Sequence, residues 1–164
     1  MIALRPATMA DAAALVAVMA EGFEGYRGFA PPDWEPQMPP VEAMAGRLAA
    51  PTTFCLVAEE DGAVAGHVSF LPSGLSTHPE PEDGLAHLWQ MFVRPPHFGS
   101  GLAGELLARA VAEARTRGYS AMRLFTPAGQ ARARRFYERE GWSLMREFDD
   151  ERLGLRVAEY RQSV

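Results

Sequence analysis

A glycine-rich stretch that follows an apolar segment is the first place where this sequence could bind a ligand. It runs Phe98-Gly99-Ser100-Gly101-Leu102-Ala103-Gly104, directly after the apolar residues 86–93. A turn between a strand and a helix exposes backbone N–H groups at the positive end of the helix dipole, which favours a phosphate or pyrophosphate. Gly99 and Gly101 carry no side chain to block an oxyanion. The stretch predicts an anion site, although glycines also occur at such turns for steric reasons alone.

Two other phosphate-binding motifs do not fit this stretch. A Walker loop needs a lysine after its last glycine, and no lysine occurs here. A dinucleotide-binding fold has its glycines after the first strand, whereas this motif follows the fourth predicted strand.

The segment from Gln130 to Trp142 is the second candidate for chemistry. If residues 129–140 form a helix, positions 130, 133, 134 and 137 share one face through their i, i+3 and i+4 spacing. Tyr137 then lies beside the small Ala133 and the polar Gln130, not in an apolar stripe. The alternative is a tyrosine that merely belongs to the core or its rim.

Both segments resemble motifs of the GNAT superfamily of acyl-CoA-dependent N-acetyltransferases. Residues 98–103 are similar to its R/Q-x-x-G-x-G/A motif, and residues 130–142 are similar to its N-x-x-A-x-x-x-Y-x-x-x-G-F/W signature at the same spacing. The order of predicted elements matches along essentially the whole chain. Two departures stand out: Phe98 replaces Arg or Gln, which removes one side-chain contact near the pyrophosphate, and Gln130 replaces Asn.

The resemblance implies that acetyl-CoA is the cosubstrate, with no metal, and that an amine attacks the thioester directly in a ternary complex. Backbone groups of Phe92 and Val93 would bind the pantetheine arm and polarise the thioester carbonyl. The resemblance also implies that the cofactor contacts the glycine-rich turn and one face of the helix at 129–140. The residues concerned are Phe98, Gly99, Ser100, Gly101, Leu102, Ala103 and Gly104 in the turn, and Gln130, Ala133 and Arg134 in the helix. Arg134 would contact a phosphate, and a solvated arginine is the alternative.

Tyr137 is the predicted general acid, which protonates the departing CoA thiolate. His87 is the first choice for the general base. It precedes Met91 and Val93 by an even number of residues, so the three side chains would share a face of the strand. The alternative is a histidine that is hydrogen-bonded within the sheet. Tyr26 and Trp34, in a segment rich in glycine and proline, are the substrate-binding candidates.

The elements that must position these residues alternate between strand and helix. The sequence predicts strands at 2–6, 53–59, 63–71, 86–93, 120–125, 142–148 and 154–161, and helices at about 10–21, 41–50, 101–117 and 129–140. The unit at 86–125 predicts a right-handed parallel crossover in an otherwise antiparallel sheet. The fold class is therefore α/β, or α+β with a mixed sheet. A GNAT-like fold with one splayed parallel pair is expected over a single domain, residues 1–164.

Composition narrows the expected partners. A net charge of −5 argues against broad nucleic-acid binding, and no apolar run reaches membrane-spanning length. The single Cys55 lies in an apolar run and is expected to be an inert buried thiol. The cytoplasm is the default location. The expected partner is a small-molecule or peptide amine. The sequence does not fix the oligomeric state, and a homodimer is a common expectation for related folds. A second class of function, an acyl-CoA-binding sensor without turnover, stays open because residues 86–93 carry no carboxylate base.

Overall fold

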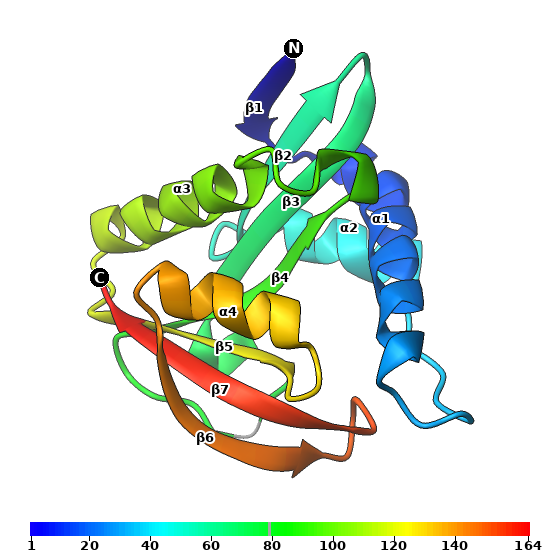
Figure 1. Ribbon diagram of the computed structural model, residues 1–164. Coiled ribbons are helices and arrows are strands. Elements are labelled where there is room, and N and C mark those ends of the chain that lie inside the picture. The colour runs from blue at the N-terminus through cyan, green and yellow to red at the C-terminus, as the bar shows by residue number, and fades with distance from the viewer. Residues whose placement is uncertain (79) are drawn as a thin grey trace.

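The described residues form seven strands that belong to one mixed sheet (Figure 1). The computed structural model describes residues 1–78 and 80–164. The order across the sheet is β1-β2-β3-β4-β5-β7-β6. The strands are β1 (Ile2–Pro6), β2 (Phe54–Glu60), β3 (Ala63–Pro72), β4 (Leu85–Val93), β5 (Ala121–Pro127), β6 (Ser143–Asp150) and β7 (Leu155–Ser163).

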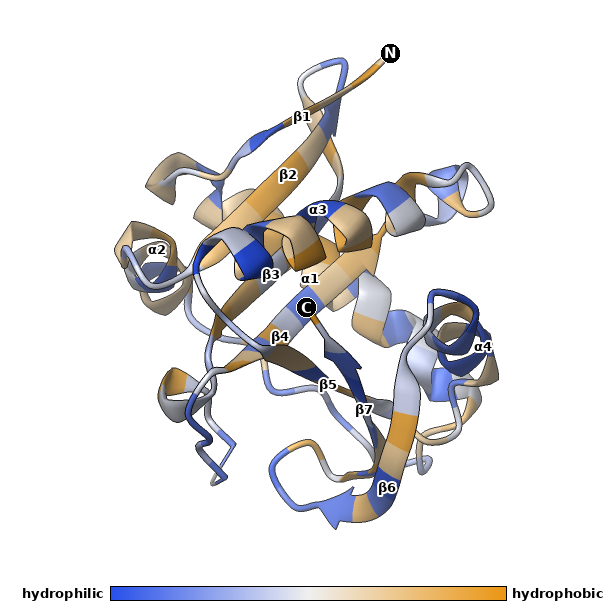
Figure 2. Ribbon diagram, turned by 90° about the vertical axis from the view of Figure 1, so that its left-hand side faces the viewer, coloured by the Kyte–Doolittle hydropathy of each residue, from blue (hydrophilic) through white to orange (hydrophobic). Residues whose placement is uncertain are grey.

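In the described part of the chain, four α-helices cover the two faces of this sheet. They are α1 (Ala12–Glu24), α2 (Val41–Ala49), α3 (Leu102–Thr116) and α4 (Ala131–Arg139). Neighbouring residues of β2 show the two layers, because Leu56 and Ala58 belong to the core beneath α3 and α4, whereas Val57 packs with α1. Figure 2 shows β2 as a strongly apolar strand, as expected for a strand buried on both faces. The mixed sheet with its parallel pair and four helices confirms the predicted fold class.

Turn chemistry explains where several elements end. Asp61 and Gly62 form the two-residue loop between β2 and β3, and both have positive φ, 52° and 78°. Asp-Gly is a favoured pair for such a hairpin because glycine adopts this conformation without strain. Gly118, with φ 86°, follows the end of α3 in the same left-handed conformation. None of the helices within residues 1–78 and 80–164 is long and apolar enough to cross a membrane.

The parallel pair β4–β5 is joined only at its first half. Leu85 to Leu88 pair with Ala121 to Leu124, and neither strand pairs with the other beyond that point. β4 continues to Val93 and β5 to Pro127. Among the described residues, the later part of β4 therefore has no neighbouring strand on the side that faces β5.

A β-bulge interrupts β4 where this pairing ends. Ser69 of β3 pairs with Gln90, but the next residue, Phe70, pairs with Leu88, so Trp89 is the extra residue. A bulge of this kind breaks the alternation of side chains along a strand. Leu88 before the bulge and Met91 after it consequently pack into the same core beneath α3 and α4.

Candidate active site

The unpaired edge of β4 offers backbone groups to a ligand. Arg94 donates its N–H to the carbonyl of Ala65 at 2.9 Å, which fixes the phase of the antiparallel ladder between β3 and β4. Because bonded and non-bonded pairs alternate, Phe92 exchanges its backbone bonds with its partner His67. Met91 and Val93 then direct their N–H and C=O groups toward the gap beside β5. The backbone groups of Phe92 are therefore used inside the sheet and cannot bind a ligand, which corrects that part of the prediction. Val93 stays a predicted backbone contact, and Met91 is the second candidate in place of Phe92.

The glycine turn lies immediately after this edge and presents free backbone donors. Gly99 and Gly101 have φ of 78° and 90°, a conformation that side chains other than glycine rarely adopt. Within the described part of the chain, the N–H groups of Gly99, Gly101, Ala103 and Gly104 have no hydrogen-bond partner. In contrast, Phe98 and Ser100 donate theirs to Pro95 and His97, and Leu102 donates to the Ser100 hydroxyl. These four free donors, before and at the start of α3, suit an oxyanion, and their contact with a pyrophosphate stays a prediction.

The start of α4 lies across the gap from β4. Gln130 occupies the N-cap position of α4 without a side-chain capping bond, and its side-chain oxygen accepts a hydrogen bond from the Thr126 hydroxyl at 3.2 Å. The amide N–H groups of Gln130 stay available to a ligand, so its predicted contact with the pantetheine arm remains a prediction. Ala133, one turn further along α4, is half-buried against the core.

Tyr137 projects from α4 into the interior. It is 8% exposed and lies among Phe136, Trp142 and Tyr160, with ring centroids 5.2–6.1 Å away. Burial, and then the nearby Tyr26, raise the pKa of its phenol. No described residue hydrogen-bonds to its hydroxyl. A protonated phenol without a protein partner is free to donate to a ligand, and its role as general acid stays a prediction.

The geometric argument for His87 as a general base is wrong. The bulge at Trp89 places His87 on the opposite face of β4 from Met91 and Val93. Its Nδ1 accepts a hydrogen bond from Nε of Arg123 at 3.2 Å, so that nitrogen is not free to take a proton. Burial and the Arg123 charge lower the pKa of His87 to about 3. His87 matches the alternative, a histidine that is hydrogen-bonded inside the sheet.

Arg134 is engaged within the protein and not in the gap. Its guanidinium forms an ion pair with Glu147 at 2.7 Å and donates to the Tyr160 hydroxyl at 3.1 Å and to the Ala128 carbonyl at 3.0 Å. These bonds use Nε and Nη1 and hold α4 against β6 and β7, whereas Nη2 has no partner among the described residues. The contact of Arg134 with a phosphate stays a prediction, and Nη2 is the group that could make it without breaking these bonds.

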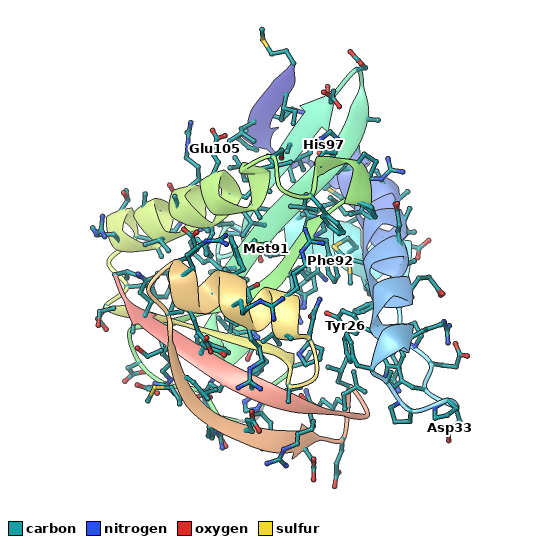
Figure 3. The ribbon with its side chains drawn as sticks, in the orientation of Figure 1. Tyr26, Asp33, Met91, Phe92, His97 and Glu105 are labelled. Carbon is teal, nitrogen blue, oxygen red and sulfur yellow. The ribbon has the colours of Figure 1, made fainter. Side chains whose placement is uncertain are left out.

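The segment between α1 and α2 closes the other end of the gap. Figure 3 shows Tyr26 at the end of α1, directed toward the space between α1 and α4. Tyr26 packs on Phe23, Phe29 and Trp34. Trp34 is 6% exposed and donates its indole N–H to the carbonyl of Leu153, which gives it a structural contact in addition to its predicted role with substrate.

A cavity of about 450 Å³ lies where this segment meets the turn between β6 and β7. Its apolar wall includes Phe29 and Pro127, and Gly129 at the start of α4 lies against Phe29. Three acidic residues, Asp149, Asp150 and Glu151, line the other side together with Arg156. Sequence reasoning missed this cavity, because its walls come from segments more than a hundred residues apart.

A model of the acetyltransferase (GNAT) family matches residues 19–142. No curated protein sequence matches the chain. Among solved structures, a GNAT-family protein from Desulfovibrio desulfuricans is 26% identical, with a TM-score of 0.72 over 99% of each chain.

Two further structures share the fold at lower identity. The yncA protein of Salmonella typhimurium, solved with its cofactor acetyl-CoA, is 22% identical, with a TM-score of 0.77 over 99% of this chain and 94% of that one. A ribosomal-protein-alanine N-acetyltransferase from Brucella melitensis is also 22% identical, with a TM-score of 0.77 over 99% of each chain.

Proposed function

The chain belongs to the acetyltransferase (GNAT) family, and we propose that it transfers an acetyl group from acetyl-CoA to the amino group of an acceptor. The unpaired edge of β4, which runs directly into a turn of free N–H donors, is the observation that carries this proposal. The edge suits an extended arm that carries hydrogen-bonding amides, and the turn suits a pyrophosphate. Acetyl-CoA contains both groups in this order and supplies the reactive thioester.

The residues present fit that cosubstrate. Met91 and Val93 would bind the pantetheine amides by adding them to the sheet as an extra strand. Their N–H groups are fixed in the ladder before the reaction, so one of them can stabilise the negative charge that develops on the thioester oxygen. Donors placed in advance in this way usually make the largest contribution to catalysis.

The proposed reaction is a direct attack in a ternary complex. The amine nitrogen forms a bond to the thioester carbon, and the carbon–sulfur bond then breaks. The attacking nitrogen, now positively charged, loses a proton to water, and Tyr137 donates its phenol proton to the departing sulfur. The phenolate of Tyr137 then regains a proton from water. With His87 held by Arg123, the amine must lose its own proton in solution or to water before it attacks.

The acceptor would enter from the cavity beside Phe29 and Pro127. This cavity lies at the carboxyl end of β5, whereas the glycine turn lies beyond the carboxyl end of β4. Because β4 and β5 are parallel, both substrates would reach the gap between these strands at the same edge of the sheet, where a ternary complex can form.

A thiol-release assay with acetyl-CoA and a panel of amines tests the proposal. The panel should contain a polyamine, an aminoglycoside, free amino acids and a peptide with an N-terminal alanine. We expect at least one amine to release CoA thiol above the hydrolysis rate and to gain 42 Da on mass spectrometry, roughly the mass of an acetyl group less one hydrogen. Tight binding of acetyl-CoA with no turnover on any amine would instead indicate a sensor.

A further inference from the structure

Phe98 and Arg132 are in contact across the two elements that flank the proposed cofactor site. The guanidinium carbon of Arg132 lies 3.8 Å from the centroid of the Phe98 ring. Phe98 belongs to the turn after β4, and Arg132 is the second residue of α4. The ring of Phe98 is 49% exposed, so its face is available for this cation–π contact.

The position of Arg132 is electrostatically unusual. The first turn of α4 contains no acidic residue but contains Arg132 and Arg134, and Arg135 follows it; Figure 2 shows this helix as strongly hydrophilic. A cation near a helix N-terminus is unfavourable, because that end already has a partial positive charge. Arg134 is neutralised by Glu147 at 2.7 Å. Within residues 1–78 and 80–164, Arg132 has neither an ion-pair partner nor a hydrogen-bond acceptor.

Such a cation is stabilised if an anion binds beside it. Groups that can bind an anion lie in the turn that contains Phe98, because the free N–H donors of Gly99 and Gly101 follow Phe98 in the chain. The donors of the turn and the guanidinium of Arg132 therefore meet at Phe98 from two different elements. A planar guanidinium can donate two parallel hydrogen bonds to phosphate oxygens.

We propose that Arg132, held on the ring of Phe98, binds the pyrophosphate of coenzyme A and replaces the side chain that the motif has lost at position 98. This inference rests on the proposed function. Phe98 acts as a positioning residue, because stacking restricts a long side chain that would otherwise lose conformational entropy when the cofactor binds. The pair thus substitutes for the arginine or glutamine that other sequences of this motif place at position 98.

Isothermal titration of purified full-length variants with CoA tests the pair. Arg132→Gln should weaken CoA binding about tenfold, the loss of one charge-assisted contact at a partly exposed site. Arg115→Gln removes the same charge near the far end of α3, where it should change the affinity less than about twofold. Dephospho-CoA lacks the 3′-phosphate but keeps the pyrophosphate, so Arg132→Gln should weaken its binding by the same factor.

Two more variants test the role of Phe98. Phe98→Leu should weaken CoA binding about threefold alone, and it should cause no further loss when Arg132 is already glutamine. Phe98→Arg in the Arg132→Gln protein should restore most of the lost affinity, because it returns a guanidinium to the position that the motif uses. Circular dichroism melting confirms that each variant is folded.

The outcomes separate this inference from the function on which it rests. Equal effects of Arg132→Gln and Arg115→Gln would overturn it, since the loss would then reflect general charge. A penalty that disappears with dephospho-CoA would also overturn it, because Arg132 would then bind the 3′-phosphate. If the wild-type protein itself fails to bind CoA, the proposed function is wrong.

Discussion

The indole N–H of Trp34 donates a hydrogen bond to the backbone carbonyl of Leu153, at a distance of 2.7 Å. This bond joins the segment between α1 and α2 to the turn between β6 and β7. The two segments are 119 residues apart in the sequence, and the proposed acceptor cavity lies between them. The bond therefore helps to hold together the two segments that line that cavity.

We expect Trp34→Phe to weaken the binding of the acceptor without affecting the binding of CoA. Phenylalanine keeps an aromatic ring but leaves the Leu153 carbonyl unpaired, which should cost about 1–2 kcal/mol in the free energy of unfolding. The KM for the acceptor should rise, whereas the Kd for CoA should not change. Urea unfolding and titration calorimetry measure these quantities. A change in CoA affinity as large as the change in KM would contradict the assignment of Trp34 to the acceptor side.

Trp142→Phe is a matched control for the unfolding measurement. Trp142 is also buried, at 3% exposed, but its indole N–H has no partner in the part of the chain that the structure describes. Both substitutions remove the same atoms, so a larger loss for Trp34→Phe reports the hydrogen bond to Leu153.

Gly101→Ala should weaken CoA binding, and Gly118→Ala should not. Both glycines lie at ends of α3 with positive φ, 90° and 86°, and an added Cβ meets no atom within 4 Å at either position. Each alanine should therefore destabilise the protein by a similar amount, about 1 kcal/mol. Only the alanine at position 101 projects a methyl group into the predicted anion site. Calorimetry with CoA should show at least a fivefold weaker Kd for Gly101→Ala alone; equal affinities would place the pyrophosphate elsewhere.

Much of the fold was predictable because local patterns and tertiary structure agree. The Asp61-Gly62 hairpin and the end of α3 at Gly118 lie where their turn residues indicate. The glycine turn is recognisable for the same reason, since positive φ at Gly99 and Gly101 selects the residue type.

The errors in the site come from features that one strand does not show by itself. The bulge at Trp89 depends on pairing with β3, and nothing in the apolar run 86–93 distinguishes Trp89 from its neighbours. The rule that side chains an even number of residues apart share a face therefore gives the wrong result across Trp89. The argument that placed His87 on the same face as Met91 and Val93 relied on that rule. Whether the backbone groups of Phe92 point toward β3 or toward the gap depends on which residue pairs are hydrogen-bonded. The bond between Arg94 and Ala65 shows this, and the sequence of β4 does not.

Stability should fall as the pH decreases from about 7 to about 4 because two histidines are buried in the neutral form. Burial lowers the pKa of His67 to about 4, and burial with Arg123 lowers that of His87 to about 3. In the unfolded chain both bind a proton near pH 6.5. Acid therefore favours the unfolded state, and each histidine should remove about 2 kcal/mol between pH 7 and pH 5.

His87→Gln tests this contribution and the catalytic role together. Glutamine can accept the Arg123 hydrogen bond but cannot titrate, so the difference in unfolding free energy between pH 7 and pH 5 should shrink by about 2 kcal/mol. The acidic limb of kcat/KM should be unchanged, because His87 is already neutral there. If that limb shifts while the stability difference stays the same, His87 is a catalytic base after all.

Tyr137→Phe should lower kcat while leaving CoA binding and folding nearly unchanged. The substitution removes only a hydroxyl that no described residue hydrogen-bonds, and the ring keeps its packing against Trp142 and Tyr160. A CoA thiol, with a pKa of about 8.5 like that of cysteine, leaves tolerably well without help, so we expect a loss of about 100-fold or less, at the low end for general acid catalysis. Pre-steady-state thiol release measures the chemical step directly. A wild-type rate for that step would exclude Tyr137 as the acid, and an unfolded variant would show that its role is structural.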